Sequence, residues 1–257
     1  MARIGKGWMG RALAAASLRR WTAAARDAGS TDLRVLRRQR AAARKLKARL
    51  DTLLFIADSR LSLPLPGTQA FPRPQDADWA WRPELWRGPL PERGLSSVPD
   101  KATLGTDATL FHDCTRSEIT LRQTRNLRAA DLAAYGLRLD VFSFDGSYLS
   151  LVIDLPPEAA QGLKRTHLIR IDTVVEMEQP LEILARLNIR HGPNTEQIVR
   201  ELPLHDQEIR VEFDLAYTRL NEKRADRMWL DLIFERPQMN KVTLRDLTFA
   251  RRPRADL

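Results

Sequence analysis

The stretch LRLDVFSFDGSYLSLVIDL, residues 137–155, lies in the middle of a long β-prone half of the chain. Its Asp145-Gly146 pair stands between two apolar segments, and this is the strongest short-range signal for a β-hairpin because glycine tolerates positive φ. A two-residue turn there places Phe142 opposite Leu149. The stretch therefore predicts a hairpin around which the β-rich half is organised.

The apolar phase slips within the first strand of this hairpin. Apolar residues are odd-numbered at Leu137 and Leu139 but even-numbered at Phe142. One extra residue at Val141–Phe142, a β-bulge, restores the register and places Leu139 opposite Leu151. A strand that is buried on both faces also lacks phase, and the pattern leaves both explanations open.

Strand-like alternation continues from residue 109 to residue 251. The clearest example is 208–215, where apolar and charged residues alternate at every position. Such alternation buries one face of a strand and exposes the other. About ten strands with turn signals between them predict a mainly β protein with a jelly-roll-like β-sandwich. A basic α-helical hairpin and a Pro/Trp-rich wrap precede the sandwich.

The charge of the chain is divided unequally. Residues 1–60 contain 15 Lys and Arg against 4 Asp and Glu, a net charge of +11, and the remaining residues contain 27 against 29, a net charge of −2. The basic part suits nucleic acid, an anionic membrane surface or an acidic protein. We predict a basic helical segment over 1–60, a Pro/Trp-rich linker that packs on the sandwich over 61–100, and the β-sandwich domain over 101–257.

Two helices are expected in the basic segment, over 7–27 and 33–57. In the second, Leu36, Ala43 and Leu50 recur every seven residues and share one stripe of the helix. An ordinary solvated helix pair explains this pattern as well as a binding surface does, because a charge run usually marks a solvated face. The residues predicted to contact an acidic partner are Arg37, Arg38, Arg40, Arg44, Lys45 and Lys47.

The segment 62–100 contains eight prolines, which exclude a regular helix or a central strand. Its Trp79, Trp81 and Trp86 have two explanations. They are a lid buried against the β domain, the more ordinary outcome for large aromatic residues, or an aromatic platform that binds a sugar ring or a proline-rich peptide. These three tryptophans are the first candidate ligand-binding residues.

The second candidate ligand site is a polar cluster at the end of one expected strand. It consists of Asn188, Arg190, His191 and Asn194, next to a Gly-Pro turn. Polar residues on loops that a rigid scaffold holds often bind ligands, here a sugar or a peptide. Turn formation by Gly-Pro-Asn is the simpler explanation for the same residues.

A catalytic pair is conceivable at His112 and Cys114, which point to the same face if they lie on a strand. We favour a buried cysteine beside a satisfied histidine, because free cysteine is among the most buried residue types. The four histidines show no metal-ligand spacing, and a phosphate loop and a serine elbow are absent from the sequence. We therefore expect no enzyme activity, no metal and no cofactor.

Cys114 is the only cysteine, which excludes an intrachain disulfide and favours a reducing compartment. No apolar run reaches the ~18–20 residues of a membrane span. The apolar stretch Ala12–Ala16 is too short for a cleavable signal peptide. We expect a cytoplasmic protein, or one that is peripheral to a membrane through its basic segment.

Five stretches resemble those of an uncharacterised family of alphaproteobacterial proteins of unknown function. They are WRPELW (81–86), FHDC (111–114), LRQTRN (121–126), FDGSYLS (144–150) and RLNIRHGPNTEQ (186–197). The resemblance covers roughly residues 70–250 and implies a bacterial protein with no established activity. The strand pattern separately resembles galactose-binding-type jelly-roll β-sandwiches, a likeness of fold that does not imply a function.

These observations predict a non-catalytic binding or assembly module. Its sandwich recognises a glycan or a protein, and its basic helices tether it to an acidic surface. Two alternatives stay open. One is a cysteine/histidine-dependent enzyme built on His112 and Cys114, and the other is a structural subunit whose basic arm binds nucleic acid or anionic lipid.

Overall fold

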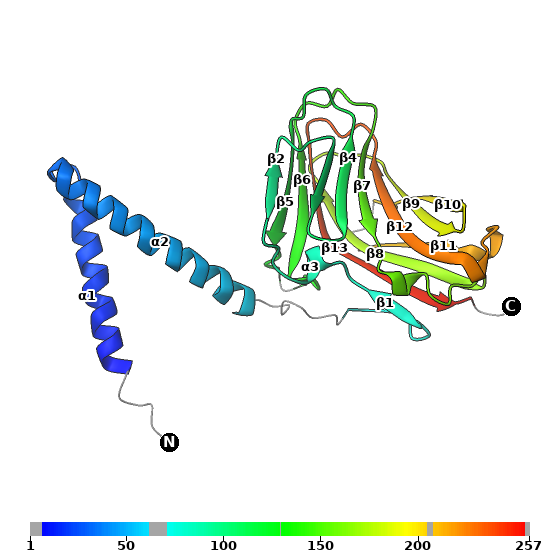
Figure 1. Cartoon of the computed structure of the whole chain (residues 1–257), viewed down its shortest axis with the longest axis horizontal. Coiled ribbons are helices and arrows are strands. Elements are labelled where there is room, and N and C mark those ends of the chain that lie inside the picture. Colours follow the sequence, from blue (N-terminus) through cyan, green and yellow to red (C-terminus); the bar gives the residue numbers. More distant parts are fainter. Residues whose placement is uncertain (1–6, 62–70, 129, 205–207, 255–257) are drawn as a thin grey trace, which may run out of the picture. The chain divides into compact units, whose positions relative to one another are not determined.

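The structure is a computed structural model that describes residues 7–61, 71–128, 130–204 and 208–254. It divides the chain into two compact units, Met1–Asp58 and Ser59–Leu257 (Figure 1). Two helices, α1 (Gly7–Arg26) and α2 (Leu33–Leu61), are the first elements of the chain. Among the described helices, none combines the length and the apolarity needed to cross a membrane.

The turn between the two helices is closed by hydrogen bonds from short polar side chains. The Thr31 hydroxyl donates to the Asp27 carbonyl oxygen at 2.7 Å, which satisfies a free acceptor after the end of α1. Asp32 Oδ1 accepts from the N–H groups of Arg34 at 2.9 Å and Val35 at 3.4 Å. Asp32 is therefore the N-cap of α2, where a carboxylate also complements the positive end of the helix dipole.

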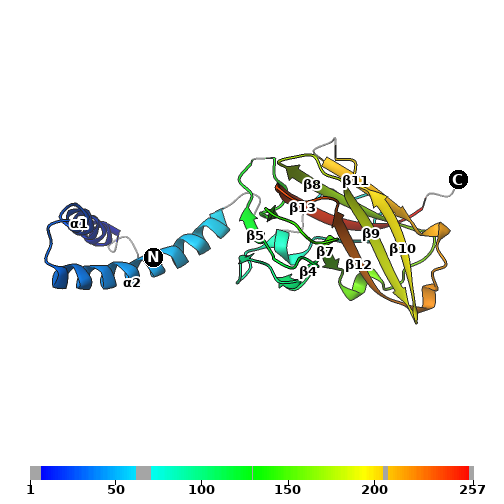
Figure 2. The same cartoon turned by 90° about the horizontal axis from the view of Figure 1, so that it is seen from above.

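The second unit is a β-sandwich of two antiparallel sheets, as predicted (Figures 1 and 2). The seven-stranded sheet has the order β11 (Glu208–Asp214), β8 (His167–Met177), β13 (Asn240–Pro253), β6 (Tyr135–Val141), β5 (Ile119–Arg125) and β2 (Gly94–Ser96), with β1 (Trp79–Trp81) also paired to β13. The six-stranded sheet has the order β10 (Asn194–Glu201), β9 (Ile183–His191), β12 (Ala225–Phe234), β7 (Leu149–Asp154), β4 (Ala108–His112) and β3 (Lys101–Leu104). Short helical turns are α3 (Glu84–Arg87), η1 (Pro157–Ala159), η2 (Leu215–Tyr217) and η3 (Glu222–Arg224).

The eight strands from β6 to β13 pair as a jelly roll. β9 pairs with β10, β8 with β11, β7 with β12 and β6 with β13, so each later strand returns beside an earlier one. This nested pairing distributes the strands over two sheets, as in jelly rolls built from two Greek keys. The strand order therefore confirms the predicted jelly-roll-like sandwich.

The hairpin predicted across Asp145-Gly146 is wrong. β6 lies in the seven-stranded sheet between β5 and β13, whereas β7 lies in the six-stranded sheet between β4 and β12. The segment between them crosses from one sheet to the other, so Phe142 does not oppose Leu149. No bulge interrupts the ladders of β6 at Val141. Six of the seven residues of β6 are buried, so the strand is covered on both faces. The phase slips at Phe142 because this residue lies beyond the end of the strand and is 55% exposed.

Asp145 and Gly146 have a different role in this crossing. Asp145 Oδ1 accepts from the N–H of Thr115 at 3.1 Å, and Asp113 Oδ1 accepts from the N–H of Ser147 at 2.7 Å. A Cβ atom at Gly146 would lie 2.5 Å from Asp113 Oδ1. The Asp-Gly pair therefore joins the crossing segment to the loop after β4, and glycine is needed there for close approach.

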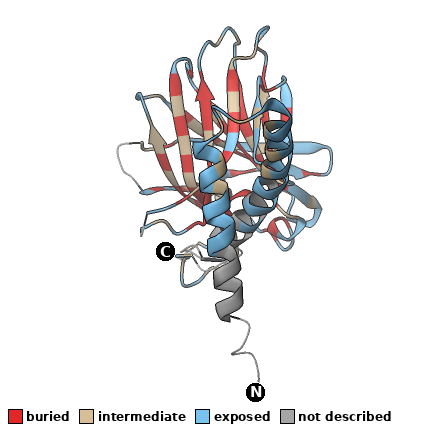
Figure 3. Ribbon diagram, turned by 90° about the vertical axis from the view of Figure 1, so that its left-hand side faces the viewer, coloured by how far each residue is buried: buried red, intermediate tan, exposed pale blue. Residues whose placement is uncertain are grey.

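The core lies between the two sheets and follows the alternation seen in the sequence. In β11, Ile209, Val211 and Phe213 are buried while the charged residues between them are not. Figure 3 shows buried and less buried positions alternating along strands of the sandwich. The same pattern holds in β8, where Ile169 and Ile171 face the core. The charged residues at the alternate positions therefore cover the outer face of the seven-stranded sheet.

A β-bulge interrupts this alternation in β13. The register between β13 and β8 shifts between Leu244 and Asp246. Leu244 and Leu247 are both buried in the core, so the two residues between them, Arg245 and Asp246, both lie outside it. An extra residue of this kind redirects side chains at one point of a strand.

Two residues of the β5–β6 hairpin hold the bulge in place. Asn126 Nδ2 donates to the Arg245 carbonyl oxygen at 2.8 Å. Gly136 lies so close to β13 that a Cβ atom there would be 2.8 Å from the Leu244 carbonyl oxygen and 3.1 Å from the Arg245 Cα. Because both of these neighbours are backbone atoms, a side chain at Gly136 cannot be accommodated without moving a strand.

We expect Gly136→Ala to lower the free energy of unfolding by about 1–3 kcal/mol, the usual cost of overpacking a core. Gly88→Ala is the matched control, because a Cβ atom at Gly88 meets nothing within 4 Å and its φ is extended. Urea unfolding of both variants measures the difference. Equal stability of the two variants would show that β13 does not approach β6 as closely as described.

Candidate functional site

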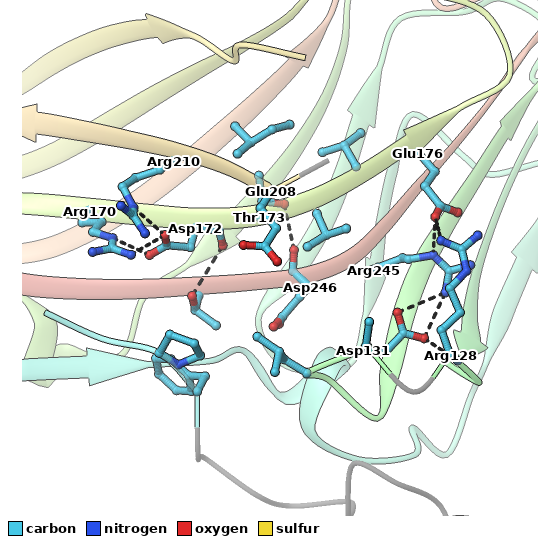
Figure 4. A pocket seen from close by; sticks show the side chains of 18 residues that line it. Arg128, Asp131, Arg170, Asp172, Thr173, Glu176, Glu208, Arg210, Arg245 and Asp246 are labelled. Atoms are coloured by element: carbon cyan, nitrogen blue, oxygen red, sulfur yellow. Dashed lines mark hydrogen bonds and ion pairs between the residues drawn. The ribbon is translucent and has the colours of Figure 1, made fainter. Parts of the chain in front are cut away.

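A cavity of about 430 Å³ lies on the outer face of the seven-stranded sheet (Figure 4). Its floor is formed by β8, β11 and the bulge of β13, and its other walls by Phe71, Pro72, Arg128 and residues 130–132. The volume is within the range of small-molecule sites, about 300–1,000 Å³. The cavity is therefore large enough to hold a small ligand.

The first charged cluster of the cavity is centred on Asp172 in β8. Arg170 donates to both carboxylate oxygens of Asp172, with two distances of 2.6 Å, and Arg210 Nε donates to Asp172 Oδ1 at 3.1 Å. The three residues occupy outward positions of two paired strands, so the sheet ladder brings them together. Two guanidinium groups are thus held in fixed orientations at one end of the cavity (Figure 4).

The second charged cluster is centred on Arg245 at the bulge. Arg245 Nη1 lies 3.2 Å from Asp131 Oδ2, and Arg245 Nε lies 2.8 Å from Glu176 Oε1. Arg128 also pairs with Glu176. These residues come from the loop before β6, from β8 and from β13, and they stand at the opposite end of the cavity from Asp172 (Figure 4).

Between the two clusters, Asp246 forms a buried ion pair with Arg82. Arg82 is completely buried, and it donates from Nε and Nη2 to the two oxygens of Asp246 at 2.9 and 2.7 Å. Its guanidinium carbon lies 4.9 Å from the ring centroid of Phe71, which lines the cavity. Burial raises the pKa of Asp246 above its ordinary value, although the Arg82 charge opposes the shift.

The charges that line the cavity nearly cancel. Four arginines line it, Arg128, Arg170, Arg210 and Arg245, and five acidic residues, Asp131, Asp172, Glu176, Glu208 and Asp246. Apolar side chains such as Val174, Ile209 and Leu132 form the rest of the wall. The cavity therefore offers fixed hydrogen-bond donors and acceptors beside apolar patches, without a strong excess of either charge.

The three tryptophans predicted as a ligand platform lie elsewhere. Trp86 is completely buried, and its Nε1 donates to the Leu244 carbonyl oxygen at 3.0 Å, so its ring has no surface open to a ligand in this structure. Trp79 and Trp81 are half-buried and pack against the core, with ring centroids 6.5 Å apart. Trp81 also lies 5.6 Å from Phe249. The ligand role of these two half-buried rings stays a prediction.

Two residues of the predicted polar cluster are buried and two are exposed. Asn188 is buried and fully engaged: its Nδ2 donates to Asp231 at 3.1 Å and its Oδ1 accepts from Gln197 at 2.9 Å. His191 is buried beneath the turn, and its Nδ1 accepts from the N–H of Asn221 at 3.4 Å. His191 Nε2 has no hydrogen-bond partner and lies 3.7 Å from Glu196 Oε1. Both Asn188 and His191 are buried, and their role in ligand binding stays a prediction.

The other two residues of that cluster are exposed. Arg190 donates to both oxygens of Asp226, at 2.8 and 3.0 Å, and Asn194 follows the Gly-Pro turn between β9 and β10. Asp226 holds the pKa of Arg190 above its ordinary value through this hydrogen-bonded pair. Arg190 and Asn194 stay candidate ligand residues on the six-stranded sheet, whereas the cavity lies on the seven-stranded sheet.

Sequence reasoning missed Trp229, which faces outward in the middle of the six-stranded sheet. It lies opposite Asn188 in the ladder of β9 and β12 and is half-buried. The Arg227 guanidinium carbon lies 5.1 Å from its ring centroid, and nearby Arg186 donates to Asp231 at 2.7 Å. The available signal is its position out of phase with the buried residues of β12, where a large aromatic side chain must face solvent.

The suspected catalytic pair is not arranged for catalysis. His112 is buried; its Nε2 lies 2.9 Å from the Val98 carbonyl oxygen and its Nδ1 accepts from the backbone N–H of Cys114 at 3.1 Å. Burial raises the pKa of the Cys114 thiol above its ordinary value. A nucleophilic cysteine needs the opposite, a lowered pKa and a free base. Within the described residues, no group of three or more His, Cys, Asp or Glu side chains is placed to hold a metal ion.

We expect Arg82→Met to lower the free energy of unfolding by about 3–5 kcal/mol, because it leaves the buried Asp246 charge without a partner. The carboxyl group has a raised pKa, so it binds a proton more readily in the folded state, and stability falls as pH rises through that pKa. The loss in Arg82→Met should therefore shrink at acidic pH. Urea unfolding across pH measures this.

The double variant Arg82→Met/Asp246→Leu is the control for this experiment. It removes both charges, and it should recover most of the lost stability, because a buried pair replaced by apolar residues is often neutral. A double variant that is as unstable as Arg82→Met at every pH would show that the loss comes from packing and not from the unpaired charge.

We expect Cys114 of the native protein to react slowly with iodoacetamide at neutral pH, because little thiolate forms below a raised pKa. The rate should increase as pH rises beyond the ordinary thiol pKa and on unfolding in denaturant. Mass spectrometry of the alkylated protein measures both. A native thiol that reacts faster than free cysteine at neutral pH would revive the enzyme hypothesis.

Three solved structures illustrate what the chain is similar to. The enzymatically active domain of tailspike protein 4 from bacteriophage CBA120 matches at 9% identity and a TM-score of 0.41, over 56% of this chain and 19% of that one. The family 11 carbohydrate-binding module of a Clostridium thermocellum cellulosomal cellulase matches at 12% identity and 0.37, over 59% and 92%. A xylan-binding domain from Paenibacillus barcinonensis matches at 10% identity and 0.34, over 63% and 95%.

This chain spans less than one fifth of the tailspike chain it matches. No curated protein matches the sequence. A family model, in contrast, matches all residues from 1 to 257, basic helices included. The chain therefore belongs to the family of unknown function DUF6478.

Proposed function

We propose that the β-sandwich is a non-catalytic module that recognises a glycan, and that the ligand occupies the cavity over β8, β11 and β13. The observation that carries this proposal is the wall of that cavity, where guanidinium and carboxylate groups pair at both ends and apolar side chains lie between them. A ligand that suits this wall is small, rich in hydroxyl groups and uncharged.

The hydrogen-bonding capacity of the wall supports a polyol. Each sugar hydroxyl can donate one hydrogen bond and accept two, so it needs donors and acceptors side by side. Asp172 with Arg170 and Arg210 offers both within one cluster. Hydrogen bonds to charged groups are also stronger than neutral ones. The ion pairs hold these groups in place before the ligand arrives, which reduces the entropy lost on binding.

The charge balance of the wall argues against an ionic ligand. A phosphate or carboxylate bound near Arg245 would compete with Asp131 and Glu176 for the same guanidinium. A cation bound near Asp172 would compete with Arg170 and Arg210. A neutral ligand leaves these pairs intact and uses only the lone pairs and N–H groups that they do not occupy.

A second place for the same function is the outer face of the six-stranded sheet around Trp229. Its half-exposed indole has the size and shape to lie against the C–H face of a sugar ring, and Arg186 with Asp231 supplies polar groups beside it. Arg227 stands over the ring at 5.1 Å and would have to move aside. The cavity is the first candidate because its groups need no rearrangement.

We also propose that the basic helices tether the sandwich to an acidic surface. The support is the net charge of +11 in residues 1–60 and the exposure of all six arginines and lysines predicted for this role: Arg37, Arg38, Arg40, Arg44, Lys45 and Lys47. The sandwich with its near-neutral charge would then meet its own ligand independently.

The glycan proposal is tested by screening the full chain on a glycan array and measuring the affinity of any ligand found by calorimetry. Arg210→Ala removes one cavity donor and should weaken binding by about tenfold or more, since a hydrogen bond to a charged group contributes about 1.5–3 kcal/mol. Arg116→Ala is the matched control, because Arg116 is an exposed arginine beside a carboxylate, Glu118, outside the cavity.

The results for these variants show whether the ligand binds in the cavity or on the six-stranded sheet around Trp229. A ligand whose affinity falls in Trp229→Ala but not in Arg210→Ala would move the site to the six-stranded sheet. A ligand that both variants bind like the unmodified chain would place recognition on neither surface. If no glycan binds the chain while a defined protein partner does, the sandwich is a protein-recognition module and the glycan proposal is wrong.

A further inference from the structure

A stripe of apolar side chains on α2 faces solvent. Leu46, Leu50 and Leu53 are 38%, 47% and 60% exposed, and Val35 is 47% exposed. Leu46 and Leu50 are four residues apart, Leu50 and Leu53 are three apart, and Val35 precedes Leu46 by eleven. These spacings are close to whole turns of an α-helix, so the four side chains lie on one side of it. Figure 3 shows the described parts of both helices almost entirely in the exposed colour. Exposed leucines that share one side of a helix are typical of a surface that binds a protein or a membrane.

The part of α2 from Leu33 to Leu50 is strongly basic. Between Leu33 and Leu50 the sequence contains eight arginines and lysines and no acidic residue. On a helical projection these basic residues occupy the sector away from the apolar stripe, so the helix has one apolar side and one cationic side. α2 has 29 residues, which gives it a length of roughly 44 Å at about 1.5 Å per residue.

The presence of an apolar side and a cationic side on one helix indicates which kind of partner can cover the exposed leucines. A second copy of the helix would bury the leucines but would bring the cationic flanks of two chains together, and like charges repel. A nucleic acid would neutralise the arginines but offers its phosphates, not an apolar surface, to the leucines. The surface of an anionic bilayer accepts both, because acyl chains lie just beneath the negative headgroups.

We propose that α2 lies along the surface of an anionic lipid bilayer, with Leu46, Leu50 and Leu53 in the acyl boundary and the arginines on the headgroup phosphates. This inference rests on the proposed tethering to an acidic surface and names that surface. The helix lies in the plane of the membrane and does not cross it, and the sandwich is thereby held at the membrane.

Co-sedimentation of the full chain with lipid vesicles tests the proposal. We expect binding to vesicles that contain phosphatidylglycerol, weak binding to pure phosphatidylcholine, and a loss of affinity as salt is raised. The triple variant Leu46→Gln/Leu50→Gln/Leu53→Gln should bind at least about tenfold more weakly, because it removes the buried apolar area. We also expect the affinity for vesicles to fall at least about tenfold in the variant Arg37→Gln/Arg38→Gln/Arg44→Gln, because it removes three positive charges.

The matched control changes three apolar residues of the sandwich unit that are more exposed than the three leucines, Leu127→Gln/Tyr217→Gln/Met239→Gln, whose exposures are 81%, 83% and 67%. It should bind vesicles like the unmodified chain. Glutamine is a good helix former, and circular dichroism verifies that the leucine variant keeps its helices.

Two results would overturn the lipid inference. If the leucine variant binds vesicles as tightly as the unmodified chain, no apolar insertion takes place. If the chain prefers duplex DNA to anionic vesicles, the tether is directed to nucleic acid, and the tethering proposal survives without the membrane. If neither vesicles nor DNA nor heparin binds, tethering and lipid binding both fail.

Discussion

The return of the last strand, β13, beside β6, β8 and β1 is the constraint on which the sandwich depends. Each of these pairings joins segments that are distant in the sequence, so none forms before the chain has nearly closed. The bulge of β13 adds a second consequence, because it turns Arg245 and Asp246 outward together. Asp246 then draws Arg82 into a completely buried ion pair, which fastens the proline-rich segment to the sheet. The bulge of β13 therefore contributes both to the closure of the fold and to the floor of the cavity.

The polar groups of the cavity lie on the outer face of the seven-stranded sheet, and in a β-sandwich this face is normally exposed to solvent. Arg170, Asp172 and Arg210 occupy positions where charged residues are ordinary, and an open sheet would leave them as surface ion pairs of little energetic value. Beside these positions the cavity is lined by Phe71, Pro72, Arg128 and residues 130–132. The side chains of Arg170 and Asp172 are 12% and 28% exposed, so their ion pair is partly shielded from water, whereas the Arg210 side chain is 63% exposed. A partly shielded ion pair is stronger and more rigid than a fully solvated one, which suits a preorganised binding site.

The two units of the chain have contrasting surfaces. The helical unit concentrates positive charge and exposed leucines, whereas the sandwich unit is near neutral and carries its polar groups in paired form. A surface of the first kind binds through long-range attraction and apolar insertion, and it needs no shaped pocket. A site of the second kind depends on the placement of individual donors and acceptors. The family model spans both units of the chain.

The sequence by itself determined the elements whose causes are local. Period-two alternation placed the strands, the alanine- and arginine-rich composition placed the two helices, and the charge count separated the basic helices from the sandwich. The tertiary structure decided which strands pair. Asp145-Gly146 has the local propensity of a hairpin, but β6 pairs with β5 and β13 and β7 pairs with β4 and β12, so the segment between them crosses from one sheet to the other. For the same reason the sequence could not show that Trp86, Asn188 and His191 are buried, or that Arg128, Arg210 and Arg245 meet at one cavity. Burial and proximity depend on long-range pairing, which no local pattern encodes.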